Sequence, residues 1–195
     1  MTPFAERIFL VEIVKQIEGA RRALCRLKRA SREGNTEAVY DDVADFCGHA
    51  ALVSKILRPQ KNKKRPQSIN RGEYLRRVLN IEAAEPALDR SLRNHLEHVD
   101  ERLEDWIVKN KSGIYIDKGL IPISVLGESV PHVRFLALNT GIYSFLDEQF
   151  DLPAIMASLD RIFDAAVTRQ SSLVAVQSQG RDLFRPRNRR TEHGR

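Results

Sequence analysis

Residues 4–31, FAERIFLVEIVKQIEGARRALCRLKRAS, carry apolar side chains at steps of three and four. Such steps place the apolar groups on one face of an α-helix, because about 3.6 residues make one turn. The residues of this stripe are Phe9, Ile13, Ile17, Ala20, Leu24 and Leu27. A long amphipathic helix needs other elements to cover its apolar face, and the rest of the chain indicates that these are mostly helices.

Three further long helices are expected. They run from Thr36 to Leu57, from Pro86 to Lys109, and from Leu152 to about Gln177. Thr36 is the expected N-cap of the first, and Pro59 ends that helix because proline disfavours helix in the preceding residue. Pro86 suits a first helical turn, where its missing N–H costs nothing.

Each of these helices has its own apolar stripe. The expected core residues are Val39, Val43, Phe46, Ala50, Val53 and Leu57 in the first, Leu88, Leu92, Leu96, Val99, Leu103 and Trp106 in the second, and Ile155, Leu159, Phe163, Ala166 and Val167 in the last. A shorter helical segment is expected at residues 73–79. The pattern therefore predicts a mainly α protein, a bundle of four long helices.

Residues 113–147 interrupt the helical pattern. Short runs of β-branched and aromatic residues occupy 113–116, 133–138 and 142–146, and Asn139-Thr140-Gly141 lies between the last two as an expected tight turn. A short β-hairpin-like insertion before the last helix is therefore expected. Residues 1–180 are predicted to form a single helical domain that contains this insertion, and residues 181–195 a basic, disordered tail.

The positive charge is concentrated in two segments of this chain of 195 residues, whose net charge is +6. Residues 58–72, an expected basic loop, hold six basic residues and no acidic one, and the tail has six arginines against two acidic residues. Lys61, Lys63, Lys64 and Arg65 in the loop are predicted to bind nucleic acid, because contacts with phosphates release counterions. The alternative is that both segments are solvated and only keep the protein soluble.

Other features restrict location and chemistry. No apolar run approaches the roughly 20 residues that cross a bilayer, and charged residues in the first turns argue against a secretory signal. Cys25 and Cys47 lack the paired spacing of a zinc site and are expected to be reduced. No phosphate-loop or hydrolase-elbow motif occurs. A cytoplasmic protein without a bound metal or cofactor is therefore expected.

The third long helix carries the segment Arg93-Asn94-His95-Leu96-Glu97-His98. On a helical wheel His95 lies on the apolar stripe and is expected in the core, whereas His98 lies at its edge, on the same side as Asn94. Arg93 lies about 140° from His98, so the two are not neighbours on an isolated helix. They would meet a ligand across the helix face or between two copies of the chain.

Arg93, Asn94 and His98, in the order Arg-Asn-x-x-x-His on a late helix of a bundle, resemble the motif of the HEPN superfamily of helical ribonucleases and nucleotide-binding modules. Many toxins of that family place a tyrosine two residues after the histidine, where this chain has Asp100. The resemblance implies a metal-independent endoribonuclease that forms a homodimer, with the motif copies of both subunits at the interface. An antitoxin or regulatory protein is a further implied partner.

The implied reaction is attack of a ribose 2′-OH on the adjacent phosphate, which cuts RNA and spares DNA. His98 would act as general base or general acid, since the ordinary pKa of histidine, about 6.5, suits both roles. Arg93 would bind the phosphate and stabilise its developing charge, and Asn94 would orient the imidazole or donate to the phosphate. The implied products carry a 2′,3′-cyclic phosphate and a 5′-hydroxyl.

Two other functions fit the same sequence. A non-catalytic HEPN-like module would bind nucleic acid or nucleotides through the basic loop and the tail. A helical protein-interaction module would instead dock a partner through the β-rich insertion and bind no RNA.

Overall fold

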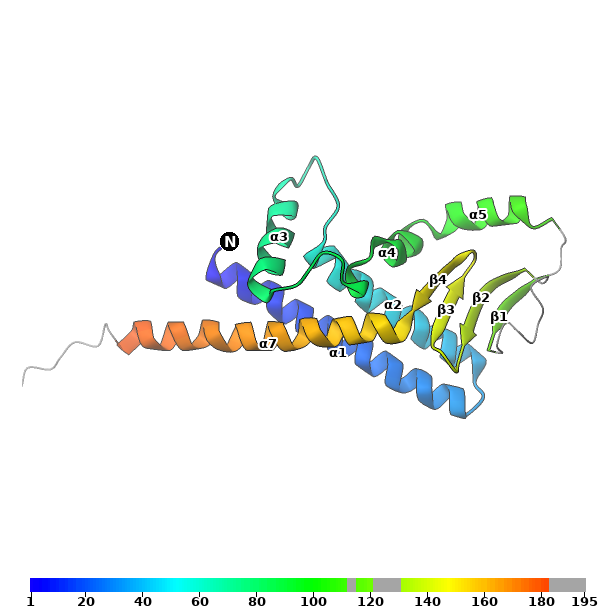
Figure 1. The fold of residues 1–195 in the computed structure, drawn as a ribbon, viewed down its shortest axis with the longest axis horizontal. Helices are drawn as coiled ribbons and strands as arrows, with labels where there is room; N and C mark the ends of the chain where they lie inside the picture. Colours follow the sequence, from blue (N-terminus) through cyan, green and yellow to red (C-terminus); the bar gives the residue numbers. More distant parts are fainter. Residues whose placement is uncertain (112–114, 121–130, 183–195) are drawn as a thin grey trace, which may run out of the picture.

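The computed structural model describes residues 1–111, 115–120 and 131–182 and is mainly helical, with a small four-stranded sheet. Three long helices make up its body: α1 (Pro3–Arg32), α2 (Thr36–Leu57) and α7 (Leu152–Asp182). α1 packs against both α2 and α7. Figure 1 shows that α7 runs along α1 and extends beyond it, at the end of the molecule away from the sheet.

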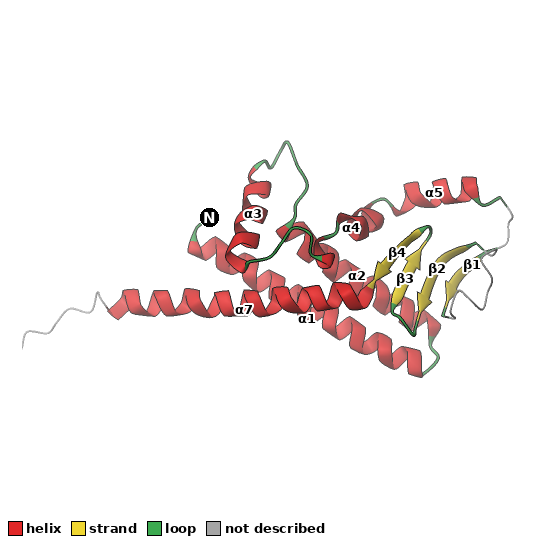
Figure 2. Cartoon of the chain, viewed as in Figure 1, coloured by secondary structure: helices red, strands yellow, loops and turns green. Residues whose placement is uncertain are grey.

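The shorter elements connect α2 to α7. They are α3 (Gln67–Leu79), the 3₁₀ helix η1 (Pro86–Leu88), α4 (Arg90–Glu97), α5 (Val99–Lys109), β1 (Ile116–Gly119), β2 (His132–Ala137), β3 (Ile142–Phe145) and β4 (Glu148–Asp151). Figure 2 shows the strands gathered at one end of the molecule. Among the helices of the described ranges, none has the length and apolar character needed to cross a membrane.

Side-chain caps determine where α1 and α2 begin. The Thr2 hydroxyl accepts a hydrogen bond from the Ala5 N–H at 3.2 Å. The N-cap of α2 is Asn35, whose side-chain oxygen accepts from the Ala38 N–H at 3.1 Å. The prediction of Thr36 as the N-cap is therefore wrong by one residue, because asparagine satisfies an otherwise unpaired helical N–H at least as well as threonine does.

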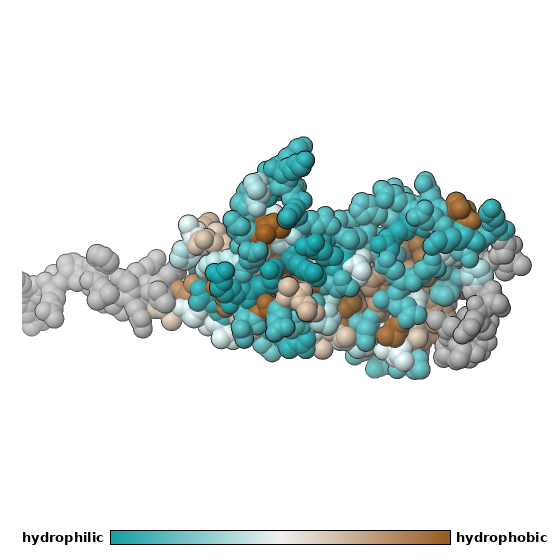
Figure 3. Space-filling view, turned by 45° about the horizontal axis from the view of Figure 1, so that its top comes forward, coloured by the Kyte–Doolittle hydropathy of each residue, from teal (hydrophilic) through white to brown (hydrophobic). Residues whose placement is uncertain are grey.

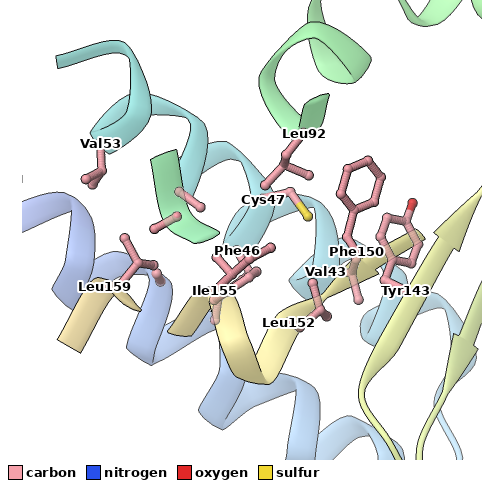
Figure 4. Close-up of a cluster of buried hydrophobic side chains, with 14 of the residues drawn as sticks. Val43, Phe46, Cys47, Val53, Leu92, Tyr143, Phe150, Leu152, Ile155 and Leu159 are labelled. Atoms are coloured by element: carbon pink, nitrogen blue, oxygen red, sulfur yellow. The ribbon is translucent and has the colours of Figure 1, made fainter. Parts of the chain in front are cut away.

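The core lies between α1, α2 and α7. All six apolar residues predicted for α2 are buried, which confirms that stripe. In α1 the stripe is slightly rotated, because Leu10 and Ala23 are fully buried while Phe9 and Leu24 are half-buried. Figure 4 shows the labelled side chains of α2 and α7 meeting around Phe46.

The last helix is longer than expected. It buries Ile155, Leu159 and Ala166 as predicted, whereas Phe163 is half-buried and Val167 is exposed. It also continues past Gln177 to Asp182. The rest of the predicted tail, residues 183–195, lies outside the described residues.

Close packing of α1 on α2 depends on Gly19. A Cβ atom at this position would lie 2.4 Å from Cε1 of His49, so a larger residue would collide with the imidazole that packs there. The imidazole of His49 therefore packs against the backbone of α1. Its Nδ1 lies 2.6 Å from Oε1 of Gln16, which ties the same two helices together.

The prediction of one continuous helix over residues 86–109 is wrong. The segment divides into η1, α4 and α5, and α4 ends and α5 begins at His98, where φ is −124° and ψ is 38°. α4 packs against α2, whereas α5 reaches the sheet, where Arg102 forms an ion pair with Glu148. A straight helix cannot follow both directions, and the chain bends between them.

The bend also divides the predicted apolar stripe. Leu88, Leu92 and Trp106 are buried and Leu103 is half-buried. Leu96 and Val99, on either side of the bend, were expected in the core but are 41% and 38% exposed. The periodic pattern was correct for each half separately and failed where the direction changes.

A four-stranded sheet replaces the predicted hairpin-like insertion. Its order is β1-β2-β3-β4, with β1 and β2 parallel and the other two pairs antiparallel. β2 and β3 surround the predicted turn, in which Gly141 has a φ of +74° that favours glycine. Because β1 and β4 extend the pair, the architecture of four long helices with one hairpin is wrong. Residues 112–114 and 121–130 of the predicted insertion lie outside the described residues.

The basic loop is shorter than predicted. α3 begins at Gln67, so the loop comprises residues 58–66 instead of 58–72, and the helix expected at 73–79 starts six residues earlier. Lys63 and Lys64 lie at the exposed turn of this loop. Figure 3 shows it as a hydrophilic projection from the body of the molecule.

Candidate nucleic-acid interface

The C-terminal end of α2 is surrounded by arginine side chains. The last carbonyl groups of a helix have no partner inside the helix, and the negative end of the helix dipole attracts cations. Here the donors come from α3 and α4. The pairs are Arg71 to the Lys55 and Ile56 carbonyls, Arg76 to Leu57, Arg93 to Arg58, and Arg90 to Pro59. Figure 1 shows the basic loop leaving α2 between α3 and α4, which brings these donors together.

Arg93, a predicted catalytic residue, is the most buried member of this group, with 2% of its surface exposed. Its Nη1 donates to the Arg58 carbonyl at 3.2 Å. Its Nε and Nη2 have no hydrogen-bond partner within the described residues. Burial lowers the pKa of Arg93, yet a guanidinium remains charged at neutral pH. A buried cation with unpaired donors is costly, so capping α2 does not by itself satisfy Arg93.

Arg93 lies at the base of a hollow of about 340 Å³, which we call the basic hollow. Lys61 and Arg65 of the loop and Arg71 of α3 line it as well. Its complete lining is Lys55, Pro59, Gln60, Lys61, Asn62, Arg65, Ser68, Arg71, Arg93 and Glu97. The hollow thus unites the predicted phosphate-binding arginine with two of the four basic residues that were predicted to bind nucleic acid. Lys63 and Lys64 do not line it.

Positive charge in the basic hollow is only partly compensated. Its one acidic residue, Glu97, lies 2.6 Å from Nζ of Lys55, and this pairing lowers the pKa of Glu97. The hydroxyl of Ser68 and Nε of Arg71 have no hydrogen-bond partner within the described residues. Guanidinium, ammonium and hydroxyl donors around one hollow are the groups that bind phosphate oxygens.

The sequence pattern did not single out Lys55, Ser68 or Arg71. Arg71 was counted in the basic run but not assigned to a site. Lys55 lies on α2, and Ser68 and Arg71 lie on α3, so only the packing of these helices brings the three residues to Arg93.

Asn94 does not have the contact predicted for it. Its side-chain oxygen accepts a hydrogen bond from Nε2 of Gln60 at 3.0 Å, which holds the basic loop against α4. Of the two roles expected for Asn94, orientation of the His98 imidazole has no side-chain contact behind it in the part of the chain that the structure describes, and donation to a phosphate stays a prediction. Their connection is through the backbone, where the His98 N–H donates to the Asn94 carbonyl at 3.0 Å.

His98 lies at the bend between α4 and α5. Its side chain is 52% exposed, and its Nδ1 lies 3.4 Å from Oε2 of Glu101. It lines neither of the hollows that Arg93 lines. The described residues of one chain therefore place Arg93 and His98 apart at these two hollows, in agreement with their separation on the helical wheel.

His95 is a core residue, as predicted. It is 2% exposed, and its ring meets the edge of Phe145 with 4.0 Å between ring centroids. Its Nδ1 lies 3.1 Å from Nη1 of Arg102 and 3.6 Å from a carboxylate oxygen of Glu148. Burial, reinforced by Arg102, lowers the pKa of His95 to about 4. The imidazole is therefore neutral at pH 7.

A second hollow, of about 460 Å³, lies between α2 and α4 and shares Lys55, Arg93 and Glu97 with the basic hollow. We call it the apolar hollow. Its other lining residues are Ala44, Asp45, Gly48, His49, Ala51, Leu52 and Leu96. Arg93 thus lines both a cationic cavity and a largely apolar one.

In the described ranges, no group of three or more His, Cys, Asp or Glu side chains is arranged to hold a metal ion. Comparison of the chain with protein-family models, with curated proteins and with solved structures found no match. The resemblance to the HEPN superfamily therefore stays a prediction.

Proposed function

We propose that this protein binds RNA and that the basic hollow holds a backbone phosphate. The observation that carries the proposal is Arg93, a buried guanidinium with two nitrogens that lack partners within the described residues. A phosphate in the hollow would supply the missing negative charge, and a shift of the guanidinium toward it would give the unpaired nitrogens an acceptor. Lys61 and Arg65, which also line the hollow, would add charge-assisted hydrogen bonds.

The projecting loop supports the same proposal. Lys63 and Lys64 lie beyond the hollow at the exposed turn, where they would reach neighbouring phosphates of a longer strand. Such contacts supply affinity without sequence preference, and they weaken as the salt concentration rises. The choice of RNA over DNA rests on the resemblance of Arg93, Asn94 and His98 to the HEPN motif.

Binding of a fluorescent single-stranded RNA, followed by anisotropy at several salt concentrations, tests the proposal. Replacing Lys61, Lys63, Lys64 and Arg65 with glutamine should weaken binding. In a plot of the logarithm of the binding constant against the logarithm of the salt concentration, the slope should become shallower by about 0.7 for each phosphate that the variant no longer neutralises. A matched variant replaces four exposed cations of α1 with glutamine: Arg7, Lys15, Arg22 and Arg29. Equal losses in the two variants would show non-specific attraction and reject the basic hollow as the site.

A second candidate is the metal-independent endoribonuclease, and the position of His98 favours it. The exposed imidazole, five residues after Arg93, is available to RNA bound on a second copy of the chain. His98 of one subunit would then exchange protons with the 2′-OH or the leaving 5′-oxygen, while Arg93 of the other holds the phosphate. This arrangement requires the homodimer.

Cleavage of RNA in EDTA separates the two candidates. The ribonuclease predicts products with 2′,3′-cyclic phosphate ends, and His98→Ala should abolish cleavage while RNA affinity and thermal stability are retained. Wild-type protein that binds RNA but does not cut it leaves the binding protein as the function and rejects the enzyme.

A further inference from the structure

The apolar hollow adjoins the basic hollow, and the two share Lys55, Arg93 and Glu97. A nucleotide joins a flat, largely apolar base to an anionic phosphate, and the pair of hollows has the same division of character. We propose that the apolar hollow binds a nucleobase of the RNA strand whose phosphate lies in the basic hollow. The inference rests on the proposed function and adds a base subsite to it.

The lining of the apolar hollow suits the faces of a base. Leu52 from α2 and Leu96 from α4 both line it, and they are 43% and 41% exposed. Leucines on the surface of two packed helices leave apolar area in contact with water, and covering it with a ring is favourable. Leu96 belongs to the stripe that was predicted to be buried, so the bend at His98 is what leaves this apolar area uncovered.

The hollow also offers an acceptor for the edge of a base. Asp45 lines it and is exposed, and its Oδ2 accepts from Nη2 of Arg26 at 2.7 Å. Within the described residues Oδ1 of Asp45 has no such partner, so it is available to a ring or amino N–H of a base. Glu97 is less available because Lys55 binds it.

Gly48 opens the space that a base would occupy. It lies in the middle of α2, and beyond its chain neighbours and the adjacent backbone of α2 no atom lies within 4 Å of a Cβ built there. Glycine inside a helix weakens it relative to alanine. A leucine at this position has room for its Cβ and would place its larger side chain in the hollow that Gly48 lines, while all the cations of the basic hollow would remain.

The test compares two ligands and three proteins. The ligands are a fluorescent hexamer of riboadenylate and a hexamer of the same backbone without bases. Gly48→Leu should weaken binding of the riboadenylate hexamer about tenfold, the effect of displacing one bound base. It should leave the affinity for the baseless hexamer unchanged within twofold. Gly48→Ala, which adds only a methyl group, is the matched control and should change the affinity for riboadenylate less than threefold.

The outcomes decide separately on RNA binding and on the base subsite. Wild-type protein that binds neither hexamer rejects RNA binding itself, and the base subsite with it. If wild type binds both and Gly48→Leu binds riboadenylate as wild type does, the base subsite is rejected while RNA binding stands. Equal weakening for both hexamers would place the leucine in the path of the backbone and also reject the base subsite. If wild type sediments as a homodimer and Gly48→Leu as a monomer, while RNA affinity is unchanged, the apolar hollow binds a second copy of the chain instead of a base.

Discussion

Two buried charges, Glu6 on α1 and Arg93 on α4, have opposite surroundings. Glu6 is 1% exposed and accepts hydrogen bonds from Nε of Arg169 at 2.6 Å and from the Tyr74 hydroxyl at 2.7 Å. Burial would raise the pKa of Glu6, but its bonds with Arg169 and Tyr74 hold that pKa below its usual value. Glu6 is thus a charge that the chain pairs within itself.

Arg93 forms no such ion pair within the described residues. Burial lowers its pKa most, the charge of Glu97 acts in the opposite direction, and the like charges of Arg90 and Arg58 lower the pKa further. A contact that serves only stability is expected to resemble that of Glu6, because an unpaired buried charge is costly. Local violations of this rule are typical of functional sites, and Arg93 is such a violation.

The largest expected effect comes from unpairing Glu6. Arg169→Met would leave the carboxylate buried with only Tyr74 as a partner, and the free energy of unfolding should fall by about 3 kcal/mol. Urea unfolding at pH 7 measures it. Arg161→Met is the control, since Arg161 pairs with Glu85 but is 56% exposed, and this change should cost much less stability. Similar small losses in both variants would remove the contrast with Arg93.

The next effect is the pH dependence that His95 confers. Its pKa is about 4 in the folded protein and about 6.5 when unfolded, so the unfolded chain binds more protons between these values. The contribution of His95 to the free energy of unfolding is therefore fully present above pH 6.5. It is lost as the pH falls toward 4, and the total loss is about 3 kcal/mol at most. Urea unfolding across this range should show a weaker pH dependence in His95→Leu than in wild type. Identical slopes would contradict the neutral, buried histidine.

The smallest expected effect on stability is that of Arg93, where the effect on binding should be larger. Arg93→Met removes a charge from a group of like charges, so the free energy of unfolding should change by less than about 1 kcal/mol. Affinity for single-stranded RNA should fall about tenfold, since the variant cannot form the buried charge-assisted hydrogen bond to the phosphate. Both quantities are measured by urea unfolding and fluorescence anisotropy.

Arg76→Met provides the matched control for Arg93. Arg76 also donates to a carbonyl at the end of α2, that of Leu57, but it does not line the basic hollow. This variant should lose stability and keep its RNA affinity. If Arg93→Met behaves in the same way, Arg93 is a helix-capping residue and the contrast with Glu6 disappears.

The predictability of the fold differed between its parts. The stripe of α2 was correct, and that of α1 was correct apart from a slight rotation, because each helix keeps one direction and one buried face along its whole length. The segment around His98 was predicted as continuous because Leu92, Leu96 and Val99 keep helical spacing through the bend. The four-stranded sheet was only partly anticipated, since the pairing of β1 with β2 joins residues that are distant along the chain.

The candidate site was predictable only as separate parts. The spacing of Arg93 to His98 predicted Arg93 as a site residue, and the run of basic residues predicted Lys61 and Arg65. The structure joins Arg93 to the basic loop and leaves His98 outside that hollow. Spacing along a helix does not specify which side chains share a cavity, because a cavity is made by neighbouring elements.

By itself, the sequence determined the three long helices α1, α2 and α7, the buried position of His95 and the concentration of positive charge in residues 58–72, because these depend on local periodicity and composition. Only the tertiary structure decided that the end of α2 collects arginines from α3 and α4. It also decided that the chain bends at His98 and that Leu96 stays on the surface beside Arg93. Packing sets these features, since it determines which carbonyls, cations and apolar faces find partners within the chain.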